Sequence, residues 1–262
     1  MKLSTAQVSS IIAFVVLFSV LYFGCNTKSK EQSDLVKTRQ QNLELINVER
    51  IIDEKKKELS GQSLVILSEM ESNLAAAEVD STRITLLKSM ASFWYKEEQP
   101  LISGYYAGKI AESLESDEQA WSICGTTFAI ASKRSDYELV QKHAIKKSRQ
   151  AYENAISINP ENVDHRINLA LSYVDFPLED NPMKGILMLV ELNKEDPDNT
   201  AVLFQLGRLA LGTNQLDKAV ERLERVVELE PDNKQAHCLL AEVYMKKGDE
   251  TKAEKNSEIC NS

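Results

Sequence analysis

The chain has 262 residues, only 9 glycines and 6 prolines, and a formal net charge of −9 at pH 7. Abundant alanine, leucine, glutamate and lysine, without the β-branched and aromatic runs that strands need, exclude a β-rich fold and predict an all-α protein. The acidic balance leaves no basic face, which excludes a nucleic-acid-binding protein.

An uncharged run, VSSIIAFVVLFSVLYFG at residues 8–24, follows a short tail of residues 1–7. Its 17 residues reach the lower limit for a membrane-spanning helix. We therefore expect a single N-terminal hydrophobic helix that anchors the chain, once, in a bacterial cell membrane. Two alternatives stay open: a cleaved secretory signal, and a lipoprotein signal in which Cys25 carries the lipid. Tyr22 and Phe23 favour the anchor, because aromatic side chains suit the membrane interface.

The side of the membrane on which the body lies stays open. Only Lys2 and the amino terminus precede the run, whereas four basic residues follow it closely: Lys28, Lys30, Lys37 and Arg39. The positive-inside rule therefore favours a cytoplasmic body. The resemblance of the run to a secretory signal favours the opposite side.

Residues 25–61 are charged and helix-prone, with an intermittent apolar stripe. The stripe is too broken for a regular heptad pattern. We expect a helical spacer that separates the body from the membrane, with a short dimer contact as the alternative.

A repeat begins to show in residues 200–233. Eight residues stand at positions 4, 7, 8, 11, 20, 24, 27 and 32 of this stretch: Leu203, Leu206, Gly207, Ala210, Ala219, Leu223, Val226 and Pro231. Small residues at positions 8 and 20 let two antiparallel helices cross closely, and large ones fill the space around the crossing. Proline at position 32 ends the second helix. The pattern closely resembles the 34-residue tetratricopeptide repeat.

The same pattern continues along the chain. We place a repeat body at residues 62–262, with one extra helix at its start and units near 84–117, 118–162, 163–199, 200–233 and 234–262. The 118–162 unit has eleven extra residues, expected in a lengthened second helix, and the 163–199 unit has three between its helices. In that turn we expect Pro182 to start the second helix and Asp180 or Asn181 to cap it.

The resemblance implies a right-handed superhelical solenoid whose first helices line a concave groove that binds a protein or peptide. In the family, positions 5 and 9 of each first helix usually face the groove. In this sequence they are Ser122 and Thr126, Ile167 and Leu171, Phe204 and Arg208, and Cys238 and Glu242. Ile167, Leu171 and Phe204 would form an apolar centre, so we predict an apolar or amphipathic partner segment. The alternative is that the long second helix or the spacer covers this patch.

Catalytic and metal-binding patterns are missing from the sequence. The cysteines (Cys25, Cys124, Cys238 and Cys260) and the single histidines lack the short spacings of metal sites, so we expect no metal and interpret the cysteines as buried thiols. We find no phosphate loop, HExxH or GxSxG motif, and expect neither a cofactor nor enzymatic activity. The sequence thus predicts a membrane-tethered scaffold that binds proteins. The alternative is a structural protein that oligomerises through its spacer or end repeats.

Overall fold

The computed structural model describes residues 46–262, in which every regular element is a helix. The tail, the uncharged run at 8–24, Cys25 and most of the expected spacer lie outside the described residues. Between residues 46 and 262, no helix combines the length and apolar composition needed to cross a bilayer.

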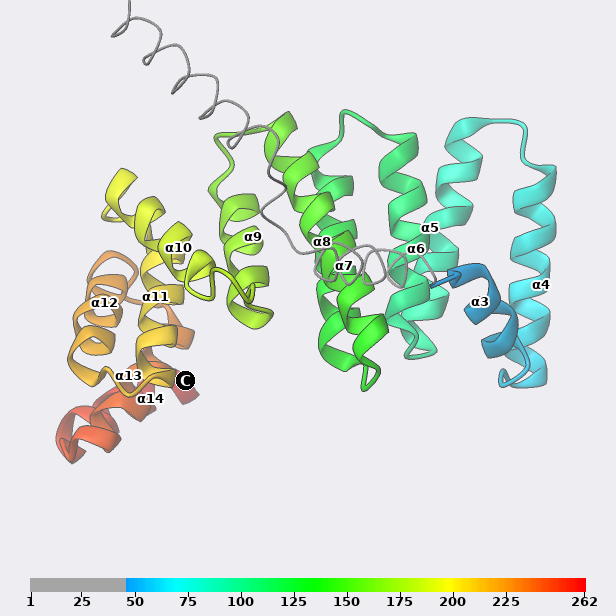
Figure 1. Ribbon diagram of the computed structural model, residues 1–262. Helices are drawn as coiled ribbons and strands as arrows, with labels where there is room; N and C mark the ends of the chain where they lie inside the picture. Colours follow the sequence, from blue (N-terminus) through cyan, green and yellow to red (C-terminus); the bar gives the residue numbers. More distant parts are fainter. Residues whose placement is uncertain (1–45) are drawn as a thin grey trace, which may run out of the picture. The chain divides into compact units, whose positions relative to one another are not determined.

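The helices follow one another in antiparallel pairs along the chain (Figure 1). Their bounds are α3 Val48–Lys56, α4 Gly61–Ala76, α5 Asp80–Lys96, α6 Pro100–Ser113, α7 Glu118–Arg134, α8 Glu138–Ile158, α9 Val163–Asp175, α10 Lys184–Glu195, α11 Thr200–Gly212, α12 Leu216–Leu229, α13 Lys234–Lys247 and α14 Glu250–Asn261. The pairs from α5/α6 to α13/α14 begin at residues 80, 118, 163, 200 and 234, and the units expected from the sequence begin at 84, 118, 163, 200 and 234. The extra residues of the second unit lengthen both of its helices: α8 has 21 residues against 14 in α12, and α7 has 17 against 13 in α11. The lengthening is therefore shared, whereas the sequence predicts it in the second helix alone.

Each pair contacts the next, as in a solenoid. Besides consecutive helices, first helices of neighbouring pairs touch one another, as α7 with α9 and α11 with α13. Stacking of this kind buries the apolar stripe of each helix against its neighbours only.

The junctions between pairs share one chemistry. Asn162, Asn199 and Asn233 each accept a hydrogen bond from a backbone N–H in the first turn of α9, α11 and α13, at 3.0–3.1 Å. These side chains satisfy donors that a helix start leaves without partners. A proline two residues before each asparagine stops the preceding helix: Pro160, Pro197 and Pro231.

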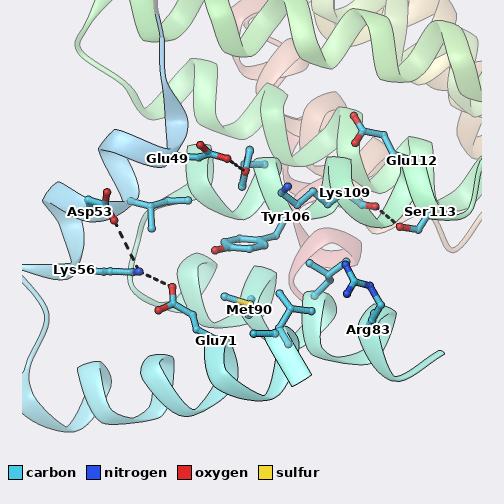
Figure 2. Close-up of a pocket in the computed structure, with 15 residues that line it drawn as sticks. Glu49, Asp53, Lys56, Glu71, Arg83, Met90, Tyr106, Lys109, Glu112 and Ser113 are labelled. Atoms are coloured by element: carbon cyan, nitrogen blue, oxygen red, sulfur yellow. Dashed lines mark hydrogen bonds and ion pairs between the residues drawn. The ribbon is translucent and has the colours of Figure 1, made fainter. Parts of the chain in front are cut away.

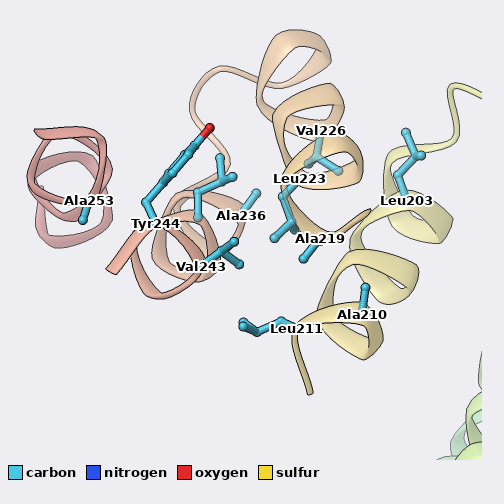
Figure 3. Packing of buried hydrophobic residues seen from close by; sticks show 11 residues of the cluster. Leu203, Ala210, Leu211, Ala219, Leu223, Val226, Ala236, Val243, Tyr244 and Ala253 are labelled. Atoms are coloured by element: carbon cyan, nitrogen blue, oxygen red, sulfur yellow. The ribbon is translucent and has the colours of Figure 1, made fainter. Parts of the chain in front are cut away.

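The C-terminal core shows how repeat spacing becomes packing. Ala219, Leu223 and Val226 are fully buried on one side of α12 and face α11 and α13 (Figure 3). Gly207 of α11 lies against Leu223, and a Cβ on Gly207 would come within 2.8 Å of Leu223 Cγ. The small residue at position 8 therefore permits the close crossing that the sequence predicts.

The turn between α9 and α10 differs from the expectation. α10 begins at Lys184 rather than Pro182, and its capping residue, Met183, makes no side-chain hydrogen bond, so neither Asp180 nor Asn181 caps it. Arg149 of α8 holds the turn instead. Its guanidinium donates to the carbonyl oxygens of Ser172, at 2.9 Å, and Phe176. These bonds satisfy carbonyls at the end of α9, and the turn is anchored by the neighbouring pair.

The end of the expected spacer belongs to the body. Residues 47–262 form one compact unit, and α3 packs on α6 with Ile52 buried. Glu49 accepts a hydrogen bond from the Tyr105 hydroxyl at 2.9 Å, and Lys56 lies 2.6 Å from Glu71 (Figure 2). Glu49 and Lys56, which the sequence assigns to the charged spacer, therefore join α3 to α6 and α4, beside a pocket lined by both acidic and basic side chains.

Candidate partner-binding groove

Two pockets open along the surface formed by the first helices α5, α7, α9 and α11, which we call the first-helix face. One, of about 620 Å³, lies between α5 and α7 above α6 and is mainly lined by apolar side chains; we call it the apolar pocket. The other, of about 310 Å³, lies among α7, α9 and α11, and we call it the polar pocket. Gln119 lines both pockets, so they adjoin on this face.

The expected apolar centre is mostly internal packing. Ile167 is 5% exposed and belongs to a core cluster of α9, α10 and α11, against which Leu171 also packs. Phe204 is half-buried against the C-terminal core. Ser122, Ile167 and Leu171 do line the polar pocket, but the apolar pair contributes only edges. Packing of Ile167 and Leu171 on side chains of α10 and α11, and of Phe204 on the C-terminal core, removes most of their surface from a partner.

Three further expected groove residues are polar, and their side chains interact with other side chains of this protein. Thr126 is exposed, and its hydroxyl lies 3.1 Å from the Tyr152 hydroxyl. Arg208 is exposed and donates from Nε to Gln205 Oε1 at 3.0 Å. Glu242 forms an ion pair of 2.9 Å with Lys246. Only Ser122, Ile167 and Leu171 of the eight expected residues are gathered at one pocket.

Cys238, the eighth, is joined to Cys260 by a disulfide, with Cα atoms 5.0 Å apart. The interpretation of all cysteines as buried thiols is therefore wrong for these two. The antiparallel packing of α13 and α14 sets position 5 of the first helix opposite position 27 of the second. Cys124 is a buried thiol as expected, and burial raises its pKa to about 12.

The polar pocket presents hydrogen-bonding groups. Its lining includes the amide side chains Gln119, Asn168 and Gln205. Beneath them His165 is buried, with Nε2 3.5 Å from Glu118 Oε2. Amide side chains both donate and accept hydrogen bonds, so they match the N–H and C=O groups of a peptide backbone.

The apolar pocket has a floor of small residues between two larger walls. Ala107 and Ala120 are nearly buried on the floor, whereas Tyr95 is 41% and Ile123 is 53% exposed on the walls. These residues lie outside positions 5 and 9 of the first helices, at which the sequence predicts the groove. Ile123 follows the position-5 residue Ser122 directly, and an isoleucine there is the signal that was available.

Part of the sequence also matches a known protein family. The sequence profile of the tetratricopeptide repeat family matches residues 184–237 and 215–255. This part of the chain is therefore similar to tetratricopeptide repeats. The matches span α10 to α14 and include the two units in which the spacing pattern is most complete.

Solved structures resemble the chain at low identity. MamA (residues 41 to the end) from Desulfovibrio magneticus RS-1 is 14% identical, with a TM-score of 0.46 over 71% of this chain and 96% of that one. YrrB, described as a TPR protein with an unusual peptide-binding site, is 18% identical, with a TM-score of 0.40 over 73% of this chain and 91% of that one. No curated protein matches the sequence.

Proposed function

We propose that this protein is a membrane-tethered, non-enzymatic scaffold that binds a segment of another protein along the first-helix face. The observation that carries the proposal is the adjoining pair of pockets on this face. One supplies apolar area and the other supplies amide groups for a backbone, and ligand sites combine these two components. Repeat arrays present extended surfaces of this kind, because each unit contacts only its neighbours.

The outer face of α14 supports a scaffold over self-assembly through this helix. α14 buries only Ala253 within its helix, and its other residues are half-buried or exposed and mostly polar. A polar outer face is typical of a terminal pair that caps a repeat array.

The buried His237 has structural partners on both ring nitrogens, which supports the non-enzymatic part of the proposal. These nitrogens lie 2.7 Å from Asn256 Oδ1 and 3.0 Å from the Pro231 carbonyl oxygen.

Photo-crosslinking tests the proposed face. We expect benzoylphenylalanine at Ile123 to crosslink the full-length chain to another protein in cells. The matched control is Leu187 on the second helix α10, which is 56% exposed against 53% for Ile123 and lines neither pocket. Equal crosslinking from both positions, or none from position 123, would contradict a partner site on the first-helix face.

The tether proposal rests on the uncharged run at residues 8–24, and the disulfide supports placing the body on the oxidising side of that membrane. Disulfides persist in extracytoplasmic compartments, whereas cytosolic thiols are kept reduced. This argument opposes the positive-inside count at Lys28, Lys30, Lys37 and Arg39. The disulfide between α13 and α14 is the stronger indicator of the side of the membrane, because it depends directly on the redox state of the compartment. Short basic flanks only bias the orientation of a membrane span.

Thiol trapping in cells checks the side of the membrane. We expect Cys238 and Cys260 to resist alkylation in intact cells and to react only after reduction, with peptide mass mapping assigning the pair. Cys124 serves as the internal control, because it becomes reactive on denaturation without a reductant. Recovery of Cys238 and Cys260 as free thiols would place the body in a reducing compartment.

A further inference from the structure

We propose that the apolar pocket binds a partner segment that combines apolar side chains with acidic ones. This inference rests on the proposed function and names the class of segment that the first-helix face would take.

The pocket has the room and the surface for side chains. Its volume of about 620 Å³ falls within the range of ligand sites. Ala91, Ala107 and Ala120 leave space that longer residues would fill, while Tyr95 and Ile123 stand exposed above them. Burying such walls under an apolar partner removes their surface from water, which is favourable in proportion to the area covered.

Positive charge surrounds this apolar surface. Lys88 and Lys96 line the pocket from α5, and the Arg134 guanidinium lies 5.8 Å from the centre of the Tyr95 ring. Within the part of the chain that the structure describes, no carboxylate lies within ion-pair distance of these three cations. By contrast, Lys133, next to Arg134, pairs with Asp175 at 2.6 Å. Two lysines without an ion pair therefore line the pocket, and Arg134 lies over its wall residue Tyr95, in a chain whose formal net charge is −9.

The one acid in the lining does not neutralise them. Asp117 caps α7, and its Oδ1 accepts hydrogen bonds from the backbone N–H groups of Gln119 and Ala120 at 2.9 and 3.1 Å. The complementary partner is therefore apolar with carboxylates at its margins, because charge complementarity selects one partner over another.

The spacing of the lysines favours a polypeptide. Lys88 and Lys96 are eight residues apart on one side of α5, which places them about 12 Å from each other along the helix. An occupant that meets both needs two separated anionic groups. The adjoining polar pocket continues the path through Gln119 with amide side chains suited to a peptide backbone. A lipid with one anionic head would use neither feature fully.

Peptide selection with a charge reversal tests this proposal. The full-length chain, held in lipid nanodiscs so that no detergent competes for the pocket, is used to select from a displayed library of random 12-residue peptides. We expect selected peptides to be rich in large apolar residues together with aspartate and glutamate. Lys88→Glu/Lys96→Glu should weaken their binding at least tenfold and select basic peptides instead.

Two further variants separate charge from folding. Lys146→Glu/Lys147→Glu makes the same charge change at exposed residues of the second helix α8 and should leave binding unchanged. Ile123→Ser should reduce binding without altering the helical circular dichroism signal, because Ile123 is on an exposed wall.

The outcomes distinguish this inference from the proposed function. Peptides that crosslink at position 123 without acidic enrichment, or without a response to the reversal, overturn the inference and leave the scaffold proposal standing. A selection that yields no peptide at the first-helix face overturns both. Crosslinks from position 123 to residues 1–45 or to a second copy, or binding of a fluorescent fatty acid in place of peptides, also overturn the inference.

Discussion

Gly185→Ala is expected to lower the free energy of unfolding by about 3 kcal/mol, at the upper end of overpacking effects. Gly185 lies where α10 crosses α9. A Cβ added there would collide with the backbone carbonyl oxygen of Ala170 and come within 2.7 Å of the backbone nitrogen of Val174. Backbone atoms in a helix cannot rotate away, so the two helices would have to separate. Urea unfolding of the full-length chain, followed by circular dichroism, measures the change.

Two other glycines calibrate this result. A Cβ on Gly207 meets the side chain of Leu223, at 2.8 Å, and a side chain gives way more readily than a backbone. Gly212, at the end of α11, has nothing within 4 Å of the added atom. We expect Gly207→Ala to have an intermediate effect and Gly212→Ala to be neutral or slightly stabilising. Equal effects at Gly185 and Gly212 would show that the α9/α10 crossing is wider than the structure places it.

Loss of the Cys238–Cys260 disulfide is expected to lower the free energy of unfolding by about 3 kcal/mol, as chain-entropy arguments give for a loop of this length. The bond joins residues 22 apart in sequence and ties α14 to α13. Among the described helices, α14 packs mainly on α13. Without the bond, α14 should open locally first, which hydrogen exchange of its amides would show as lost protection.

Reductant dependence provides the control for the disulfide. Dithiothreitol should lower the stability of the natural chain and leave Cys238→Ala/Cys260→Ala unchanged, because that variant has no bond to reduce. A natural chain whose unfolding is insensitive to the reductant would contradict a stabilising role for the bond.

Helix positions followed from local spacing, and so did the register within the repeats. The pattern of Leu203, Gly207, Ala219 and Leu223 predicted which residues of α11 and α12 meet, because each repeat buries its stripe against sequence neighbours. The long α8 and the extra helix α4 were also predictable, since helix periodicity continues through them.

Other features depended on residues far apart in sequence. The start of α10 differs from the capping prediction, and the turn before it is held by Arg149, which belongs to the preceding pair. The disulfide depends on how α13 and α14 align, which the cysteine spacing alone does not specify.

The candidate site also combines features that local sequence predicts with features that only the tertiary structure sets. The resemblance to the tetratricopeptide repeat implied that the first helices form the surface for a partner, and the partner site on them stays a proposal. The exposure of each position on that surface depended on the distance between neighbouring pairs. Close packing buries Ile167 in the core, whereas the alanines of α5, α6 and α7 leave Tyr95 and Ile123 exposed beside Lys88 and Lys96. Pair-to-pair distances come from the sum of many side-chain volumes, and no local pattern encodes that sum.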